Sequence, residues 1–149
     1  GRITELETKG GGGTSTPVSI STPTPTRTIS NPAYESALAK FRSRDFQGSI
    51  DEFSSLLSSG VADDMADNCA YWIGESFFAQ RKFPDAIQNF ESVVALAGSD
   101  KADDAQLMIG NAYAAMGDRT AAREALQGLI SKFPSSPLVK RARAKLNKL

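Results

Sequence analysis

The sequence predicts an all-α fold in which pairs of helices repeat along the chain. Apolar residues fall at helical spacing from Tyr34 to the end of the printed sequence. Residues 71–94, YWIGESFFAQRKFPDAIQNFESVV, contain two amphipathic helical patterns separated by a break at residues 82–84. Parts of this double pattern recur on both sides of it, and Gly74 and Gly110 are 36 residues apart. Recurrence at a fixed period of this length is typical of proteins built from stacked repeats.

Length and composition limit what the chain can be. Its 149 residues fit one domain, and Lys plus Arg equal Asp plus Glu at 17 each, so the net charge favours neither a nucleic acid nor an anionic membrane as partner. No apolar run approaches the ~20 residues that span a bilayer, and we expect no direct membrane insertion. The single cysteine, Cys69, cannot form an intramolecular disulfide, and its apolar surroundings favour a buried thiol over a reactive one.

The first 33 residues differ in amino-acid composition from the rest of the chain. Residues 1–9, GRITELETK, place Ile3 and Leu6 three apart among charges, as the last turns of a heptad coiled coil would. Residues 10–33 are rich in Gly, Thr, Ser and Pro and have few large apolar groups, which predicts a disordered linker. The folded domain is therefore expected over residues 34–149.

Within that domain, three helix pairs are expected over about residues 34–60, 67–98 and 103–134. Asp45 is a plausible N-cap for the second helix of the first pair, because its side chain can accept from free backbone N–H groups. Pro84 suits the first turn of the second helix of the second pair, where no intrahelical N–H bond is lost.

One more helix is expected over residues 137–148. Ser136 would be its cap and Pro137 its first residue. Its apolar stripe consists of Leu138, Ala142, Leu146 and Leu149, and its remaining surface carries Lys140, Arg141, Arg143, Lys145 and Lys148. We interpret it as a capping helix whose charges favour solubility; contact with an acidic partner is the alternative.

The period and the motif residues resemble those of the tetratricopeptide repeat (TPR), a helix-turn-helix unit of ~34 residues. The matching residues are Ile73, Gly74, Phe77, Ala86 and Phe90 in the second pair, and Ile109, Gly110, Tyr113, Ala122, Leu126 and Pro134 in the third. The first pair is atypical, with Ala37 for the glycine and Ser49 for the alanine, as expected of a terminal repeat. The expected fold is a right-handed TPR superhelix of three helix pairs plus a C-terminal capping helix.

In such a superhelix, the first helix of each pair lines a concave groove that binds partners. The residues at the groove-facing places of the repeat are Tyr34, Leu38, Phe41, Asn68, Tyr71, Glu75, Phe78, Asp104, Leu107, Asn111 and Ala114. This set mixes aromatic anchors with amide and carboxylate groups, a combination that suits an extended or helical peptide. The alternative is that Tyr34, Tyr71 and Phe78 pack between repeats.

The residue types argue against catalysis. The chain contains no His, which excludes Ser-His and Cys-His nucleophile systems and every His-containing metal site. The adjacent carboxylates of Asp63 and Asp64, and those of Asp103 and Asp104, each precede a helical pattern, where capping and interaction with the helix dipole are the favoured roles. We expect no enzyme activity, no metal and no cofactor.

Three longer strings resemble a particular family. They are YWIGE at residues 71–75, the phrase KFPDAIQNFESVV that follows, and LISKFPSSPLVKRARAKL at residues 129–146. They are similar to the C-terminal TPR domain of the Tol–Pal-associated family called YbgF or cell division coordinator CpoB. In that family a proline closes the first two repeats, whereas here SSGVADD and LAGSDKADD stand at those places.

The resemblance implies a periplasmic adaptor made with a signal peptide, which trimerises through an upstream coiled coil and continues through a linker into the TPR domain. It implies TolA and a bifunctional peptidoglycan synthase as partners, and a role linking the Tol–Pal envelope-constriction machinery with peptidoglycan synthesis in cell division. Two alternatives remain open: a TPR component of outer-membrane protein assembly, and a structural module that self-assembles through its end repeats.

Overall fold

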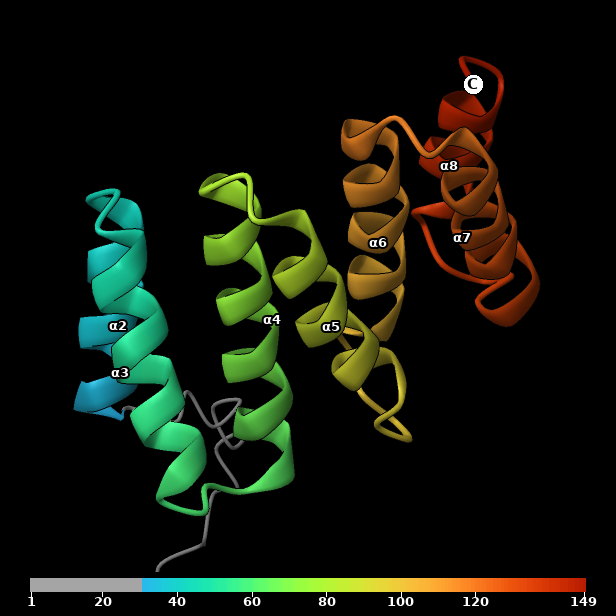
Figure 1. Cartoon of the computed structure of the whole chain (residues 1–149). Coiled ribbons are helices and arrows are strands. Elements are labelled where there is room, and N and C mark those ends of the chain that lie inside the picture. The colour runs from blue at the N-terminus through green and yellow to red at the C-terminus, as the bar shows by residue number, and fades with distance from the viewer. Residues whose placement is uncertain (1–30) are drawn as a thin grey trace, which may run out of the picture. The chain divides into compact units, whose positions relative to one another are not determined.

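Residues 31–149 are described by a computed structural model, and within them the chain forms seven α-helices and no strand (Figure 1). The helices are α2 (Pro32–Arg42), α3 (Phe46–Ser58), α4 (Asp63–Ala79), α5 (Phe83–Val94), α6 (Ala102–Met116), α7 (Arg119–Lys132) and α8 (Val139–Leu146). Each helix packs chiefly against its neighbours in the sequence. The predicted all-α fold of three helix pairs and a closing helix is confirmed. The expectations for residues 1–9 and 10–30 fall outside the described residues.

The first helix starts earlier than predicted. Helix α2 begins at Pro32, within the stretch that the sequence assigned to the linker. The side chain of Asn31 caps it, because its Oδ1 accepts from the backbone N–H groups of Ala33 and Tyr34 at 3.0 and 3.2 Å. Proline at the first helical position loses no intrahelical hydrogen bond, so Pro32 starts the helix without strain.

The turn inside each pair has the same backbone conformation. It contains one residue in the left-handed region, with φ of 68° at Arg44, 62° at Arg81 and 85° at Gly117. In each turn the next residue's N–H donates back to a carbonyl near the end of the preceding helix, as from Lys82 to Phe77 at 2.9 Å. After the first turn Asp45 caps α3, as predicted, by accepting from the N–H of Gly48 at 3.0 Å. The repeats therefore share a turn geometry as well as a period.

Close approach of the two helices within a pair explains the Gly and Ala positions of the motif. A Cβ added at Gly74 would lie 2.7 Å from the Phe90 ring, and one added at Gly110 would lie 2.8 Å from Leu126. Atoms cannot come that close without rearrangement, so α4–α5 and α6–α7 pack at a separation that only glycine permits at these points. Phe90 is fully buried, which stabilises the fold by roughly 1.5–3 kcal/mol relative to an exposed side chain.

Three apolar clusters follow one another along the stack. The first lies among α2, α3 and α4, the second chiefly among α4, α5 and α6, and the third among α6, α7 and α8. Cys69 belongs to the first cluster and is fully buried, and burial raises the pKa of its thiol to about 11. The prediction of a buried, unreactive thiol is confirmed.

The paired carboxylates lie inside helices and not before them. Asp63 and Asp64 are in the first turn of α4, and Asp103 and Asp104 are in the first turn of α6. The capping positions are occupied by other residues whose side chains make no cap hydrogen bond. The predicted interaction with the helix dipole fits this placement. None of the four carboxylates is at the N-cap position, and only Asp103 accepts from a free N–H of the first turn, that of Asp104 at 2.9 Å.

Serine residues close the second and third helix pairs by bonding to carboxylates on the first helix of each pair. The hydroxyl of Ser99 donates to Asp67, which is 4 % exposed, at 2.5 Å, and the hydroxyl of Ser136 donates to Asp103, also at 2.5 Å. Each serine Oγ also accepts from the backbone N–H two residues later. The same bond thus ties the end of one pair to the first helix of that pair at two places in the stack.

The second of these bonds changes the start of the last helix. Residues 137–148 were predicted, but α8 spans Val139–Leu146. The Ser136 hydroxyl accepts from the N–H of Leu138 at 3.0 Å while it donates to Asp103. This arrangement holds residues 136–138 in a turn, so Pro137 precedes the helix instead of starting it.

Candidate functional site

The predicted partner-binding residues lie on the first helix of each pair. Tyr34, Leu38 and Phe41 are on α2; Asn68, Tyr71, Glu75 and Phe78 are on α4; Asp104, Leu107, Asn111 and Ala114 are on α6. We call these eleven residues the first-helix face. Leu38 and Leu107 are 8 % and 4 % exposed and belong to the apolar clusters, so they support the face from below. Most of the others are half-buried, and Ala114 is exposed.

Aromatic residues fill the junction between the first two pairs. The indole N–H of Trp72 donates to the hydroxyl of Tyr34 at 3.0 Å, and the Trp72 ring lies 5.0 Å from that of Phe41 between centroids. Tyr34 also packs edge-on against Phe53 at 5.3 Å. Tyr34 and Phe41 therefore hold α2 against α4; the packing alternative expected this of Tyr34 but did not include Phe41. Trp72 was not among the predicted site residues, although it is the chain's one tryptophan and follows Tyr71 directly.

Tyr71 lies near the centre of the face and combines packing with charge contacts. Its ring is 5.7 Å from the rings of both Trp72 and Phe90, and the Lys101 ammonium is 5.5 Å from its centroid. Burial raises the pKa of the Tyr71 hydroxyl, and the nearby negative charge of Glu75 raises it further. Tyr71 stays neutral at physiological pH and can donate a hydrogen bond.

Glu75 is the least satisfied polar residue of the face. Its Oε1 is buried and makes no hydrogen bond within residues 31–149. Burial raises the pKa of this carboxyl, hydrogen bonding of the carboxyl by the adjacent Tyr71 hydroxyl opposes that rise, and the charge of Asp104 adds to it. An unpaired buried acceptor is costly, and a partner that brought an N–H or a cation here would remove that cost.

Asp104, on α6, is the second carboxyl of the first-helix face, and we call Glu75 and Asp104 together the acidic centre. Burial and the charge of Asp103 raise its pKa, while the cations Lys101 and Arg141 oppose the rise. Carboxyl groups with raised pKa values on two neighbouring helices mark this region as unlike the rest of the surface, and such perturbed groups cluster at functional sites.

The two asparagines of the face differ in how far they are already engaged. The Asn68 amide donates to the Asp64 carbonyl at 2.7 Å within its own helix. The Asn111 amide reaches only the sulfur of Met108, at 3.4 Å, and a thioether is a weak acceptor. Asn111 is therefore the amide better placed to exchange its present contact for one with a partner.

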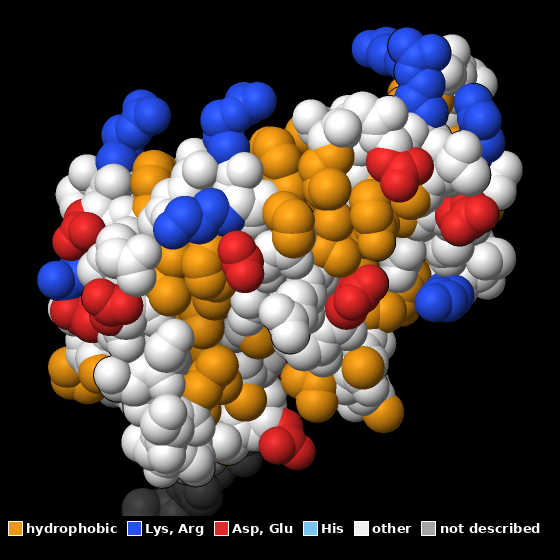
Figure 2. Space-filling model, viewed as in Figure 1, with side chains coloured by type: hydrophobic (Ala, Val, Ile, Leu, Met, Phe, Trp, Pro, Cys, Tyr) orange, Lys and Arg blue, Asp and Glu red, His pale blue; other side chains and the backbone are white. Residues whose placement is uncertain are grey.

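Beyond the acidic centre the surface becomes apolar. The Phe78 ring packs on Phe83 at 5.2 Å, and Met116, two residues after Ala114, is 48 % exposed. Apolar side chains gather in the region of α5 and α6 in Figure 2, and Lys and Arg side chains extend from the end where α8 lies. Protein-binding surfaces combine an apolar centre with polar groups around it, and this region contains both kinds of group.

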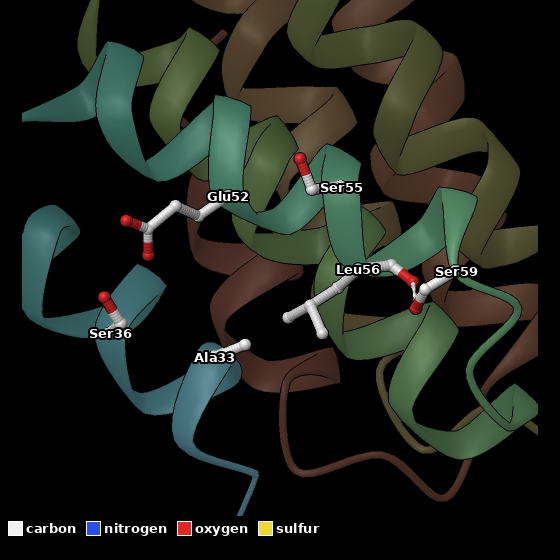
Figure 3. A pocket seen from close by; sticks show the side chains of 6 residues that line it. All are labelled: Ala33, Ser36, Glu52, Ser55, Leu56 and Ser59. Carbon is white, nitrogen blue, oxygen red and sulfur yellow. Dashed lines mark hydrogen bonds between the residues drawn. The ribbon is translucent and has the colours of Figure 1, made fainter.

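A hollow of about 410 Å³ lies elsewhere, between α2 and α3 (Figure 3). It is lined by Ala33, Ser36, Glu52, Ser55, Leu56 and Ser59. In the second pair, 37 residues further on, Ala33 and Ser36 correspond to Ala70 and Ile73, which are both buried, and Ile73 packs against the first pair. Because the corresponding residues of the second pair are buried, the hollow lies on the side of the first pair where another pair would stack. The serines that line the hollow are polar and suit contact with water.

Residues 31–149 show no sign of a metal site or a membrane span. No group of three or more Cys, Asp or Glu side chains in this part of the chain could hold a metal ion. None of its helices combines the length and the apolar character needed to cross a bilayer.

Comparisons with known proteins agree on the fold. Two tetratricopeptide-repeat family models match, one over residues 34–102 and one over residues 77–146. Among solved structures, the N-terminal domain of stress-induced protein-1 (STI-1) from C. elegans is similar with a TM-score of 0.61 and 19 % sequence identity. That match covers 77 % of this chain and 98 % of the other. No curated protein matches the chain.

At 19 % identity the structural likeness concerns the fold alone. The family models add the repeat class, and together they span the three helix pairs and α8. TPR domains generally mediate protein–protein interactions and are typically non-catalytic scaffolds. Residues 34–146 of this chain form a tetratricopeptide-repeat domain.

Proposed function

We propose that the chain is the TPR part of a periplasmic adaptor that links the Tol–Pal envelope-constriction machinery with peptidoglycan synthesis during cell division. The support is the likeness of YWIGE, KFPDAIQNFESVV and LISKFPSSPLVKRARAKL to the YbgF/CpoB family. The proposed partners are TolA and a bifunctional peptidoglycan synthase, and the proposed assembly is a homotrimer held by a coiled coil upstream of the TPR domain.

We assign partner binding to the part of the first-helix face on α4 and α6. The observation that carries this assignment is the buried, unpaired Oε1 of Glu75 beside the Tyr71 hydroxyl. A buried acceptor without a donor calls for an explanation; Ser49 and Asp67 also have such an atom, and of the three residues only Glu75 lies on the first-helix face. Tyr71 supplies a rigid aromatic group and Asn111 an amide with a weak present contact, so a peptide crossing both helices would find an anchor and hydrogen-bonding groups together.

The alternative of a self-assembling module is not favoured by the two ends of the stack. Stacking one domain on another requires apolar end surfaces. The first pair places Ser36 where the second pair has the buried Ile73. At the other end α8 covers the third pair and turns charged side chains outward.

Binding to the periplasmic part of TolA, measured by isothermal titration calorimetry, tests the proposal. Asn111→Ala should weaken binding without changing the melting temperature, and Tyr71→Ala should weaken it by about 1–3 kcal/mol. Tyr71→Phe, which keeps the ring, separates loss of the hydroxyl from loss of packing. Gln88→Ala, at an exposed position of α5, is the matched control and should bind normally.

Two results would count against the proposal in different ways. If TolA and the synthase do not bind the unmodified chain, the assignment to the Tol–Pal machinery fails. If they bind and Asn111→Ala, Tyr71→Phe and Gln88→Ala all bind equally well, the partner uses another surface.

A further inference from the structure

The overall neutrality of the chain conceals a strong separation of charge. Residues 31–124 contain eight Lys and Arg against fifteen Asp and Glu, an excess of seven negative charges. Residues 125–149 contain six Lys and Arg and no acidic side chain. Surfaces that serve only solubility intersperse both signs, whereas a field of one sign attracts an oppositely charged partner.

Packing fixes which side of α8 carries this charge to the surface. Ala142 is fully buried, and Leu138, Val139, Leu146 and Leu149 pack against the cluster of α6 and α7 residues. The opposite side carries the cations: Lys140, Arg141, Arg143 and Lys148 are exposed and Lys145 is half-buried. Figure 2 shows Lys and Arg side chains standing out from this end of the molecule.

The α8 cations are not neutralised by the domain itself. The salt bridges within residues 31–149 join Lys40 to Asp45 and to Glu52, and none involves α8. Arg141 lies near enough to Asp104 to oppose the rise in its pKa, which places one edge of the α8 charge beside the first-helix face. Lys140, Arg143 and Lys148 are exposed to solvent.

We propose that the cationic side of α8 is a second docking surface, which adjoins the first-helix face at Arg141, and that it binds an acidic peptide segment of a partner protein. A membrane-bound helix would need a free apolar face, but the apolar side of α8 is used in the core. A nucleic acid would bring extended negative charge against the excess of seven negative charges on residues 31–124. A short acidic segment can contact α8 alone and avoid that repulsion.

Fluorescence anisotropy of the full chain with a labelled poly-glutamate peptide of about ten residues tests this surface directly. A poly-glutamine peptide of the same length is the neutral probe. The variant Lys140→Gln/Arg143→Gln/Lys148→Gln removes three exposed cations, two in α8 and Lys148 just after it, and Arg42→Gln/Arg119→Gln/Arg123→Gln removes three exposed cations elsewhere.

We expect poly-glutamate to bind, poly-glutamine not to bind, and affinity to fall between about 50 and about 200 mM NaCl as screening increases. The α8 triple variant should bind about tenfold more weakly, because each exposed pair contributes a fraction of a kcal/mol, and the control triple should change binding less than about twofold.

Three results would overturn the proposal. Poly-glutamate could fail to bind, or the two triple variants could weaken binding equally, which would show a general charge effect. Vesicles with anionic phosphatidylglycerol, or a short DNA duplex, could bind more tightly than the peptide in an α8-dependent manner, and the surface would then belong to a lipid or nucleic-acid partner. None of these outcomes bears on binding at the first-helix face.

Discussion

Glu75 combines a cost to folding with a place at the proposed binding site. Its carboxyl is partly buried, one of its oxygens has no donor within residues 31–149, and its pKa is raised. Exchanging such a carboxylate for a neutral group of similar shape is expected to be stabilising. The residue therefore links stability to function in a measurable way.

Replacing Glu75 with Gln should stabilise the domain, and the gain should depend on pH. A carboxyl whose folded-state pKa is raised disfavours folding once it ionises, so the cost is absent below the ordinary glutamate pKa and complete above the raised value. Denaturation of Glu75→Gln and of the parent protein should therefore give similar stabilities at acidic pH and a growing advantage for the variant as pH rises. Glu91→Gln, at an exposed position of α5, should show no such trend.

The opposite result would remove this account of Glu75. If Glu75→Gln is less stable than the parent at neutral pH, the carboxylate must have a structural partner, and its unpaired oxygen would no longer point to a ligand.

The register of the repeats placed the predicted binding residues on the correct helices, but it did not predict which of them are buried. Counting from Gly74 and Gly110 in the second and third pairs, and aligning Phe46 with Phe83 for the first pair, places all eleven on the first helices, but Leu38 and Leu107 are buried. Trp72 was missed because the register assigns it no place on the face. Its contacts with Tyr34 and Phe41 come from a different helix pair and are not encoded in local spacing. Partner binding by the face stays a prediction.

At the scale of helices, local signals predicted the pairs, and local caps start α2 and α3, whereas a long-range bond lies next to the start of α8. Periodicity and the Gly and Ala positions were sufficient for the pairing, because steric fit between adjacent helices depends on those residues. The start of α8 could not be read from the sequence. It depends on the hydroxyl of Ser136 bonding to Asp103, which is 33 residues away, whereas the sequence pattern of Ser136 and Pro137 alone is typical of a helix start.

Ser99 offers a test of these bonds between elements. Ser99→Ala should destabilise the domain by about 1–3 kcal/mol, because Asp67, already with one unpaired oxygen, would lose the donor to its other oxygen while remaining buried. Urea denaturation measures the change. Ser92→Ala is the control: that serine is exposed and donates within its own helix, so its loss should cost less than about 0.5 kcal/mol.

A double variant strengthens the test. In Ser99→Ala/Asp67→Ala neither group remains to be left unpaired, so the combined cost should be smaller than the sum of the single costs. Additive costs would mean that the serine and the aspartate act independently.

For the molecule as a whole, two surfaces of different chemistry are distributed along one stack. The first-helix face on α4 and α6 has an acidic centre and an aromatic anchor, and the cationic side of α8 follows it at the C-terminal end. Charge steers encounter over distances of about a Debye length, roughly 8–10 Å in physiological salt, while buried aromatic contacts determine how long a complex lasts. An adaptor could use the second surface to select a partner and the first to hold it.

Photo-cross-linking to the periplasmic part of TolA tests the central claim most directly, because it reports which surface the partner touches. A photoreactive phenylalanine analogue at position 111 of α6 should give a cross-linked product, and the same group at position 88 of α5 should give none. A strong product from position 88 and none from position 111 would show that the partner binds the second helices, and would contradict binding at the first-helix face.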